Sequence, residues 1–450
     1  MPRLFALLPL LTLAACNSYE NFFVAGYEQE NFNNNADILF VVDNSDSMQP
    51  VAEDLALNIN SFISTLTSEA ASNVSRETLS DAVSNFIREV GGDTLLIDYQ
   101  LAVTTSAVDY AGGGPTSGLD EGEAGTLVGE PSVISRDDED PSLEFQASVL
   151  CGASCIDAND VASDPAYVCT ENPEPGEQIT REYLDCLCGP GEWTGHCGSG
   201  NEMQVEAAYI AMCRAVAAPP DGCYEYEDPI GSGAKPTVFQ TGDEGSNDGM
   251  LRGGAQTVLV LITDEGDSSY RLATGETDME VYIDLFDAFE EPVRMAVVGP
   301  AYHDSDLGCN SGGAQPWGVE RMQNLVGELD GVYIDIEAPD ANGDCAYTDF
   351  GENLKQIGAL LSSLLSSFPL RTVPDVSTIS VFVDGEAVPT SVVLSGSLET
   401  GDVVYGDGWS YDAAQNSVSF HGAAIPGYNA DVKIYYLPLG GNPRDLPPGF

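Results

Sequence analysis

The chain has 450 residues, and its 15 Lys and Arg against 72 Asp and Glu give a formal net charge of −57 at pH 7. This charge argues against nucleic acid as a partner, because a polyanion would be repelled. The chain is too long for a single ordinary hydrophobic core, so we expect two or three folded units. Its 43% hydrophobic and 19% charged residues are close to the average of globular proteins, so we expect it to fold.

The N-terminus carries an export signal. Residues 1–15 are typical of a signal peptide, because the apolar run at 4–13 is too short to span a bilayer. The run ends in Leu-Ala-Ala-Cys16, which resembles the lipobox of bacterial lipoproteins and implies that Cys16 is lipidated. Asn17 rather than Asp follows, so we expect a lipid anchor in the outer membrane or at the cell surface, with residues 16–36 as a polar tether.

The cysteine content predicts disulfides. Eleven cysteines less Cys16 leave ten, an even number in a chain that leaves the reducing cytosol. We expect Cys309 to pair with Cys345, because both stand apart from the rest. Connectivity among the other eight does not follow from the sequence. These are Cys151, Cys155, Cys169, Cys186, Cys188, Cys197, Cys213 and Cys223.

Alternating strands and helices begin at residues 38–42, Ile-Leu-Phe-Val-Val, a run typical of a strand buried on both faces. The pattern predicts further strands at 97–106, 257–262, 293–298 and 332–336, and helices at 51–69, 78–90, 202–216, 278–289, 317–328 and 354–365. The alternation predicts an α/β domain over residues 37–370, with a doubly wound, mostly parallel sheet covered on both faces.

Two regions depart from this alternation. Residues 110–200 contain a Gly-Gly-Gly-Pro sequence, an acidic run at 137–140 and most of the cysteines, so we expect a disulfide-rich surface insertion. Period-two alternation over 374–439 predicts a small all-β domain, followed by a tail at 440–450. In that domain we expect aromatic side chains to fill the core rather than bind sugar. They are Trp409, Tyr411, Phe420 and Tyr428.

Polar residues follow the first buried strand directly, in the sequence Asp43-Asn44-Ser45-Asp46-Ser47. Their side chains therefore emerge at the carboxyl end of the strand, where open α/β sheets bind ligands. A hard cation prefers oxygen ligands, and alternate residues of a tight turn direct one carboxylate and two hydroxyls to one point. We therefore expect Asp43, Ser45 and Ser47 to bind Mg²⁺ or Ca²⁺.

Residues 38–48, ILFVVDNSDSM, resemble the opening of a von Willebrand factor A (vWA) domain, of the type found in bacterial lipoproteins, with its metal-ion-dependent adhesion site. The resemblance implies a second carboxylate at the end of a later central strand. The sequence VLVLITDEGD at 258–267 places Asp264 there, although Glu265 stands where the family has Gly. Glu265 and Asp267 are then either solvated loop acids or ligands of a second cation.

The third element of the family is a Thr at the start of a helix, and the resemblance places Glu202 at this position. Its carboxylate either adds negative charge at the cation, which favours Ca²⁺ over Mg²⁺, or complements the helix N-terminus. Thr104 and Thr105 are weaker substitutes for the missing hydroxyl.

In the family, an acidic side chain of a partner completes the coordination of the cation. The resemblance therefore implies a lipid-anchored envelope protein that binds an unknown protein ligand through a divalent cation, without catalysis. Two alternatives remain open at this stage. One is a structural envelope protein with a vestigial or purely structural metal site, and the other is a metal-dependent hydrolase.

Motifs for other chemistries are incomplete. The chain has three His and contains neither His-Glu-x-x-His nor Gly-x-Ser-x-Gly, so metalloprotease and serine-hydrolase templates find no support. His196 and Cys197 lie close to Cys186 and Cys188, which leaves a zinc cluster as a less favoured alternative in an oxidising compartment. Residues 340–344 begin like an EF-hand loop but lack its Gly and Glu at the sixth and twelfth positions.

Overall fold

The structure is a computed structural model of the 450-residue chain. The residues it describes are 35–67, 98–108, 110–111, 124–169, 172–194, 197–198, 202–224, 235–236, 239–289, 293–300, 302–303, 306–307, 309, 314–329, 331–340, 342, 344–365, 367–370, 372–397, 402–413, 416–421, 424, 426 and 432–439. The expected signal peptide with Cys16, the tether up to residue 34, the helix at 78–90 and the tail lie outside these residues. Within the described ranges, no helix combines the length and apolarity that crossing a bilayer requires.

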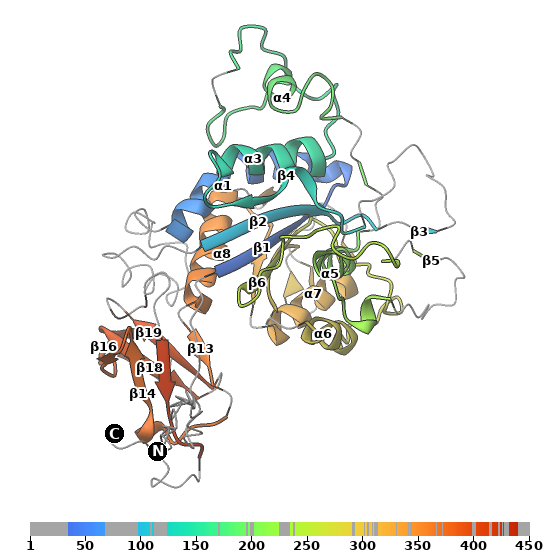
Figure 1. Cartoon of the computed structure of the whole chain (residues 1–450). Coiled ribbons are helices and arrows are strands. Elements are labelled where there is room, and N and C mark those ends of the chain that lie inside the picture. Colours follow the sequence, from blue (N-terminus) through green and yellow to red (C-terminus); the bar gives the residue numbers. More distant parts are fainter. Residues whose placement is uncertain are drawn as a thin grey trace, which may run out of the picture.

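A six-stranded sheet forms the centre of the main domain, in the order β10-β7-β6-β1-β2-β4 (Figure 1). Neighbouring strands are parallel except that β4, at one edge, is antiparallel to β2. The strands are β1 (Asn35–Val42), β2 (Asp98–Thr105), β4 (Val128–Ser135), β6 (Gln256–Ile262), β7 (Val293–Gly299) and β10 (Val332–Asp335). The predicted α/β class and mostly parallel sheet are confirmed. The strand order reverses at β1, so the carboxyl end of β1 is a topological switch point.

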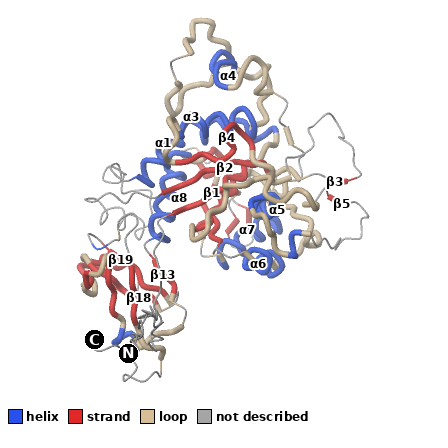
Figure 2. The backbone as a smooth tube through the Cα atoms, viewed as in Figure 1, coloured by secondary structure: helices blue, strands red, loops and turns tan. Residues whose placement is uncertain are grey.

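Helices cover both faces of this sheet (Figure 2). One face carries α1 (Gln49–Thr67), α3 (Pro141–Ala147) and α8 (Phe350–Leu365), and the other carries α5 (Gln204–Ala215), α6 (Glu280–Asp287) and α7 (Pro316–Glu328). Side chains of β1 alternate between the two cores: Phe40 and Val42 pack on the first, and Leu39 and Val41 on the second. Burial on both faces explains why residues 38–42 of β1 are continuously apolar.

The remaining short elements lie in connections around the main sheet. They are η1 (Asp46–Met48), β3 (Tyr110–Ala111), η3 (Ser148–Ala153), α4 (Arg181–Leu187), η4 (Asp221–Cys223), β5 (Lys235–Pro236), β8 (Tyr302–His303), β9 (Asp306–Leu307), β11 (Glu337–Pro339) and β12 (Cys345–Tyr347).

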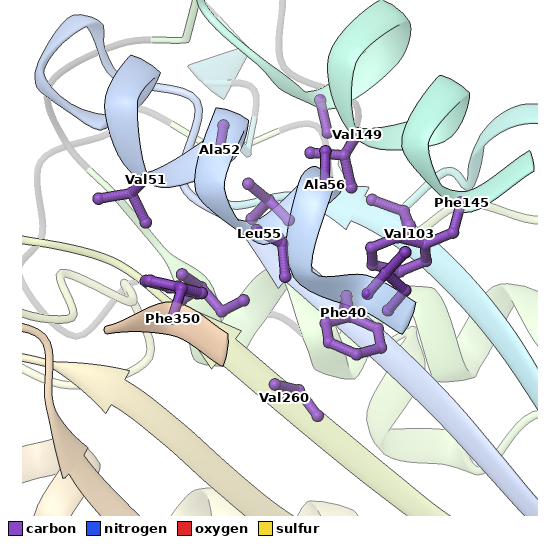
Figure 3. Packing of buried hydrophobic residues seen from close by; sticks show 14 of the residues in the cluster. Phe40, Val51, Ala52, Leu55, Ala56, Val103, Phe145, Val149, Val260 and Phe350 are labelled. Atoms are coloured by element: carbon purple, nitrogen blue, oxygen red, sulfur yellow. The ribbon is translucent and has the colours of Figure 1, made fainter. Parts of the chain in front are cut away.

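Residues 128–150 belong to the main domain, whereas the sequence predicted an insertion from residue 110. Strand β4 pairs with β2, and Phe145 of α3 is fully buried with its ring centroid 4.9 Å from that of Phe40 (Figure 3). The middle of β4 is exposed and contains Pro131, which an edge strand tolerates. Because of these residues, the sequence of β4 lacks the alternation of apolar and polar side chains by which a strand is predicted. The stapled excursion therefore starts near Cys151.

Five disulfides join the described cysteines, which is typical of proteins that fold outside the reducing cytosol. Cys309 and Cys345 are paired as predicted. The other pairs are Cys151–Cys188, Cys155–Cys197, Cys169–Cys186 and Cys213–Cys223. The zinc-cluster alternative is wrong, because a cysteine in a disulfide offers no thiolate to a metal.

The C-terminal region is antiparallel, as predicted. Its strands are β13 (Ser367–Pro369), β14 (Ser380–Val383), β15 (Glu386–Val388), β16 (Val393–Ser397), β17 (Asp402–Tyr405), β18 (Gly408–Asp412), β19 (Ser417–His421) and β20 (Val432–Tyr435), and η5 (Val376–Thr378) is a short helix. Asp384 and Gly385 both have positive φ, as a two-residue hairpin between β14 and β15 requires. Trp409 and Phe420 lie in the core of this region, and Tyr411 packs against it. Tyr428 lies outside the described residues.

Replacing Phe145 tests whether residues 141–150 belong to the main core. We expect Phe145→Ala to lower the free energy of unfolding by about 3–5 kcal/mol, because it removes a fully buried ring. Denaturant unfolding of the oxidised protein measures this loss. Val168→Ala is the control, since this exposed side chain lies in the excursion, and equal effects of the two variants would contradict the assignment.

His421 predicts an acid sensitivity of the C-terminal region. Its Nε2 lies 2.7 Å from Ser410 Oγ, and burial lowers the pKa of His421 to about 4. The unfolded chain, with a His pKa of about 6.5, therefore binds protons more readily than the folded state, and stability falls as the pH drops from about 6.5 towards 4. Thermal unfolding should show a larger loss between pH 7.5 and 4.5 for wild type than for His421→Gln. Equal losses would rule this role out.

Candidate metal site at the carboxyl end of the sheet

The carboxyl ends of β1, β2 and β6 are tied together by backbone hydrogen bonds just beyond the strands. Asp43 N donates to Ile262 O at 2.9 Å, and Ser106 N donates to Val42 O at 3.0 Å. The loop after β1 is therefore fixed between its two neighbours, at the switch point of the sheet. This is the position that the sequence predicted for the site.

Asp43 is fully buried, and both of its carboxylate oxygens are oriented by the protein. Oδ1 accepts a hydrogen bond from Ser45 N at 2.8 Å, and Oδ2 accepts one from Thr263 Oγ1 at 2.6 Å. Burial raises the pKa of Asp43 to about 7, while these bonds lower it and the charge of Asp264 raises it further. A cation beside Asp43 would favour the ionised carboxylate and remove much of this burial cost.

Thr263 is held in turn by two donors. Gln204 Nε2 donates to Thr263 Oγ1 at 2.8 Å, and Glu265 N donates to the same oxygen at 2.9 Å. With its lone pairs occupied, the hydroxyl directs its own proton to Asp43. The Thr263 hydroxyl therefore connects the loop after β1, the loop after β6 and the start of α5.

The two serines of the loop lie together, with Ser45 Oγ 3.2 Å from Ser47 Oγ. Ser45 is buried and Ser47 is exposed, so the pair connects the buried Asp43 to the surface. The structure thus brings together the carboxylate and two hydroxyls that the motif predicted. A cation bound here would be accessible from solvent.

Asp264 lies next to this set and is 2% exposed. Neither of its carboxylate oxygens accepts a hydrogen bond of regular geometry from the described residues. Burial raises the pKa of Asp264, which the nearby hydroxyls of Ser47 and Tyr347 partly offset and the charge of Glu337 reinforces. A buried acceptor without a donor costs about 1–3 kcal/mol. Such an acceptor fits a cation ligand better than a structural hydrogen bond.

Glu202 occupies the position of the expected Thr and is 1% exposed. Neither of its oxygens has a hydrogen-bond donor in the described part of the chain. Burial raises the pKa of Glu202 to about 10, and the charges of Asp43 and Glu265 add to this rise. Glu202 is therefore close enough to Asp43 and Glu265 for their charges to act on it. Of the two possible substitutes, Thr104 Oγ1 donates to Thr126 O at 2.8 Å, whereas Thr105 Oγ1 is buried without a described partner.

Asp267 has a structural role and is not a solvated loop acid. It is fully buried, and Oδ1 accepts hydrogen bonds from Val205 N at 3.1 Å and from Ser269 Oγ at 2.6 Å. Oδ2 accepts from Ser269 N at 3.1 Å and lies 3.7 Å from Arg321 Nη1. Asp267 thus caps the start of α5, and its oxygens are already occupied.

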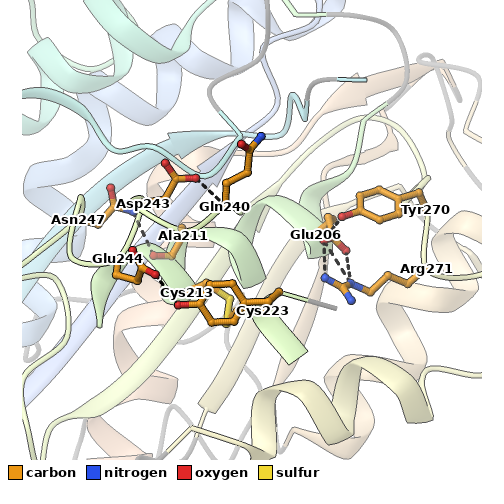
Figure 4. The surroundings of a disulfide bond; sticks show 11 residues. Glu206, Ala211, Cys213, Cys223, Gln240, Asp243, Glu244, Asn247, Tyr270 and Arg271 are labelled. Carbon is orange, nitrogen blue, oxygen red and sulfur yellow. Dashed lines mark hydrogen bonds and ion pairs between the residues drawn. A yellow bond between two sulfur atoms is a disulfide. The ribbon is translucent and has the colours of Figure 1, made fainter. Parts of the chain in front are cut away.

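Helix α5, which carries Gln204, is anchored by a buried ion pair (Figure 4). Glu206 lies 3.0 Å from Arg271, and it accepts hydrogen bonds from the hydroxyls of Tyr270 at 2.6 Å and Tyr282 at 2.7 Å. Removing one member of such a buried network leaves an uncompensated charge. The start of α5 is therefore held firmly next to the site.

Two site residues escaped the sequence analysis. Tyr347 and Glu337 come from the antiparallel pair β11–β12, and Tyr347 OH lies 3.4 Å from Ser47 O. Burial raises the pKa of Tyr347 to about 12, and the charges of Asp264 and Glu337 add to this. Neither residue lies in a motif. The sequence marks this hairpin only through Cys345 and through the incomplete EF-hand-like segment at 340–344, which forms its turn.

The stapled excursion also borders the loop. Gly198 N donates to Asn44 O at 2.9 Å, and Cys155 Sγ lies 3.8 Å from Asp46 Oδ1. Cys155 forms a disulfide with Cys197, the residue before Gly198. This bond holds the two segments of the excursion that contact the loop close to each other. The excursion therefore forms part of the border of the candidate site.

The donor set suits a hard cation. No group of three or more His, Cys, Asp and Glu in the described ranges is placed to hold a metal. Mg²⁺ is commonly bound by only one or two carboxylates with further oxygens and water, and Ca²⁺ also accepts carboxylate, neutral oxygen and water ligands. Asp43, Asp264, Ser45 and Ser47 supply oxygens of this kind. The orphaned oxygens of Asp264 support the same fit.

No protein-family profile and no curated protein sequence matches the chain. Among solved structures, it is similar to a von Willebrand factor type A protein from Catenulispora acidiphila, with 9% identity and a TM-score of 0.32 over 90% of this chain and 57% of that one. It is also similar to the pilus adhesin SpaC from Lactobacillus rhamnosus GG, with 9% identity and a TM-score of 0.30 over 91% and 39% of the two chains. The pilus adhesin RrgA from Streptococcus pneumoniae gives 11% identity and a TM-score of 0.24 over 91% and 57%.

The chain thus spans 57% or less of the length of these three proteins. At these TM-scores the superpositions carry no argument about function. The vWA-like fold of the main domain rests on its doubly wound sheet and on the D-x-S-x-S loop at the switch point, both of which were predicted from the sequence.

Replacing Thr263 tests the orientation of Asp43. We expect Thr263→Val to weaken Mg²⁺ or Ca²⁺ binding, because Asp43 Oδ2 loses its hydroxyl donor. The buried acceptor left behind should also lower the metal-free stability by about 1–3 kcal/mol. Calorimetric titration and denaturant unfolding measure the two effects. Thr257→Val, at the other end of β6, is the matched control and should leave cation affinity unchanged.

Proposed function

We propose that this chain is an exported, lipid-anchored envelope protein that binds a partner protein through a divalent cation. Asp43, Ser45, Ser47 and Asp264 would hold the cation. One observation carries the proposal. At the switch point, the buried carboxylates of Asp43 and Asp264 lie next to the hydroxyls of Ser45 and Ser47, and Ser47 is exposed to solvent. A bound cation would supply positive charge for an acidic side chain of the partner.

The surroundings of the site support binding rather than a purely internal role. Ser47 and Asp46 are exposed, so a partner can approach the cation from solvent. The excursion and the β11–β12 hairpin border the loop and offer additional contact surface. The disulfides agree with an extracytoplasmic site of action, and Cys16 would provide the membrane anchor.

Thermal unfolding tests whether Asp43 holds the cation. We expect Mg²⁺ or Ca²⁺ to raise the melting temperature of wild type, since a ligand at 100 times its Kd stabilises the folded state by about 2.7 kcal/mol. Asp43→Ala should abolish this shift. Asp46→Ala removes an exposed carboxylate of the same loop and should keep it. A full shift in Asp43→Ala would overturn the metal assignment.

Capture from envelope fractions tests the adhesive role. Wild type and Asp43→Ala are each used with and without EDTA, and we expect specific capture only by wild type in the presence of the cation. Identical captures in all four conditions would contradict cation-dependent adhesion. If the cation still raises the melting temperature of wild type, identical captures would indicate a purely structural metal site.

A further inference from the structure

Two glutamates depart from the family motif, and the fold brings them together. Glu202 opens the α5 region where a Thr is expected, and Glu265 follows β6 where a Gly is expected. Their side chains lie close enough for hydrogen bonding, and this contact influences the pKa of each. Glu202 is 1% exposed and Glu265 is partly buried. The contact therefore lies next to Asp43 and away from bulk water.

The charges at this point are not balanced by the protein. A single divalent cation neutralises Asp43 and Asp264, and Glu202 and Glu265 then add two negative charges whenever both are ionised. The neighbouring charges with the largest influence on the pKa values of these four carboxyls are themselves acidic.

Arg271 and Arg321, two arginines on this side of the sheet, are already engaged. Arg271 pairs with Glu206 at 3.0 Å, and Arg321 lies 3.7 Å from Asp267. Two ionised carboxylates in contact repel each other strongly when buried. The pair therefore requires either a shared proton or a second positive ion.

Buried oxygens without a hydrogen-bond donor favour a second positive ion over a shared proton. Both carboxylate oxygens of Glu202 are buried without a donor from the described part of the chain, and so is Oε1 of Gln204, whose Nε2 is fixed on Thr263. A shared proton satisfies at most one oxygen of each glutamate, and it leaves the Gln204 carbonyl unpaired. A cation accepts several oxygens at once. Buried oxygens that lack a donor are the ligands that such an ion requires.

We propose that Glu202 and Glu265 hold a second divalent cation next to the first. The proposal rests on the proposed metal site at Asp43. Ca²⁺ suits two carboxylates completed by neutral oxygens and water, because it takes six to eight oxygen ligands in flexible geometry. With two cations, four positive charges balance the four carboxylates. An acidic partner then meets a neutral centre, whereas one cation and a proton shared by the glutamates would leave one negative charge that repels it.

Calorimetric titration of the full chain with Ca²⁺ tests the proposal, after divalent cations have been removed. We expect Glu202→Gln and Glu265→Gln each to bind one Ca²⁺ fewer than wild type and to keep the Asp43-dependent melting shift. Glu202→Thr, which restores the hydroxyl of the family motif, should do the same. Glu139→Gln, an identical charge change on an exposed acid, should bind as many ions as wild type.

The outcomes separate this proposal from the proposed function. If the three variants bind as many Ca²⁺ ions as wild type while Asp43→Ala loses one, the second cation is overturned and the first site stands. If Asp43→Ala loses nothing while the glutamate variants each lose one ion, the Asp43 site is overturned. Gln is isosteric with Glu and removes a buried charge, so the glutamate variants should fold. Far-ultraviolet circular dichroism checks this.

Discussion

A carboxylate buried without a positive partner at the end of the central strand is the constraint on which the rest of the site depends. The strand β1 is apolar on both faces, so its carboxyl end delivers Asp43 into the interior rather than to solvent. Its hydrogen bonds come from one backbone amide and one neutral hydroxyl, which orient a carboxylate without neutralising it. Placing a charge in this way is costly unless an ion compensates for it.

The surrounding elements are organised to keep this costly arrangement in place. The Thr263 hydroxyl receives donors from α5 and from its own loop, so a rotation would break three contacts at once. Helix α5 is held in its first turn by the Asp267 cap and by the buried Glu206–Arg271 pair. Preorganisation of this kind favours cation binding, because little side-chain entropy is lost when the ion arrives.

The sequence predicted the central strands and the loop after β1 because each carries a local signal: continuous apolar runs, and polar residues directly after them. It failed where the signal was weak or distant. The edge strand β4 lacks clear alternation around Pro131, and residues 141–150 were assigned to an insertion although Phe145 packs on Phe40. Tyr347 reaches the site from 300 residues along the chain from Ser47, a separation at which no spacing rule operates. The capping role of Asp267 was not predicted, because Val205 and Arg321, two of its partners, come from other segments.

Gly198 sets a limit on how this molecule can diversify. A Cβ atom at this position would lie 2.3 Å from Asn44 Oδ1, so the buried Asn44 side chain would have to move within the loop that carries the candidate ligands. The outer part of the stapled excursion is free of that restriction and can accept substitutions and changes of length. Sequence changes that alter the choice of partner are therefore expected in the outer excursion. At Gly198, where the excursion returns to the sheet, the side chain is expected to remain small.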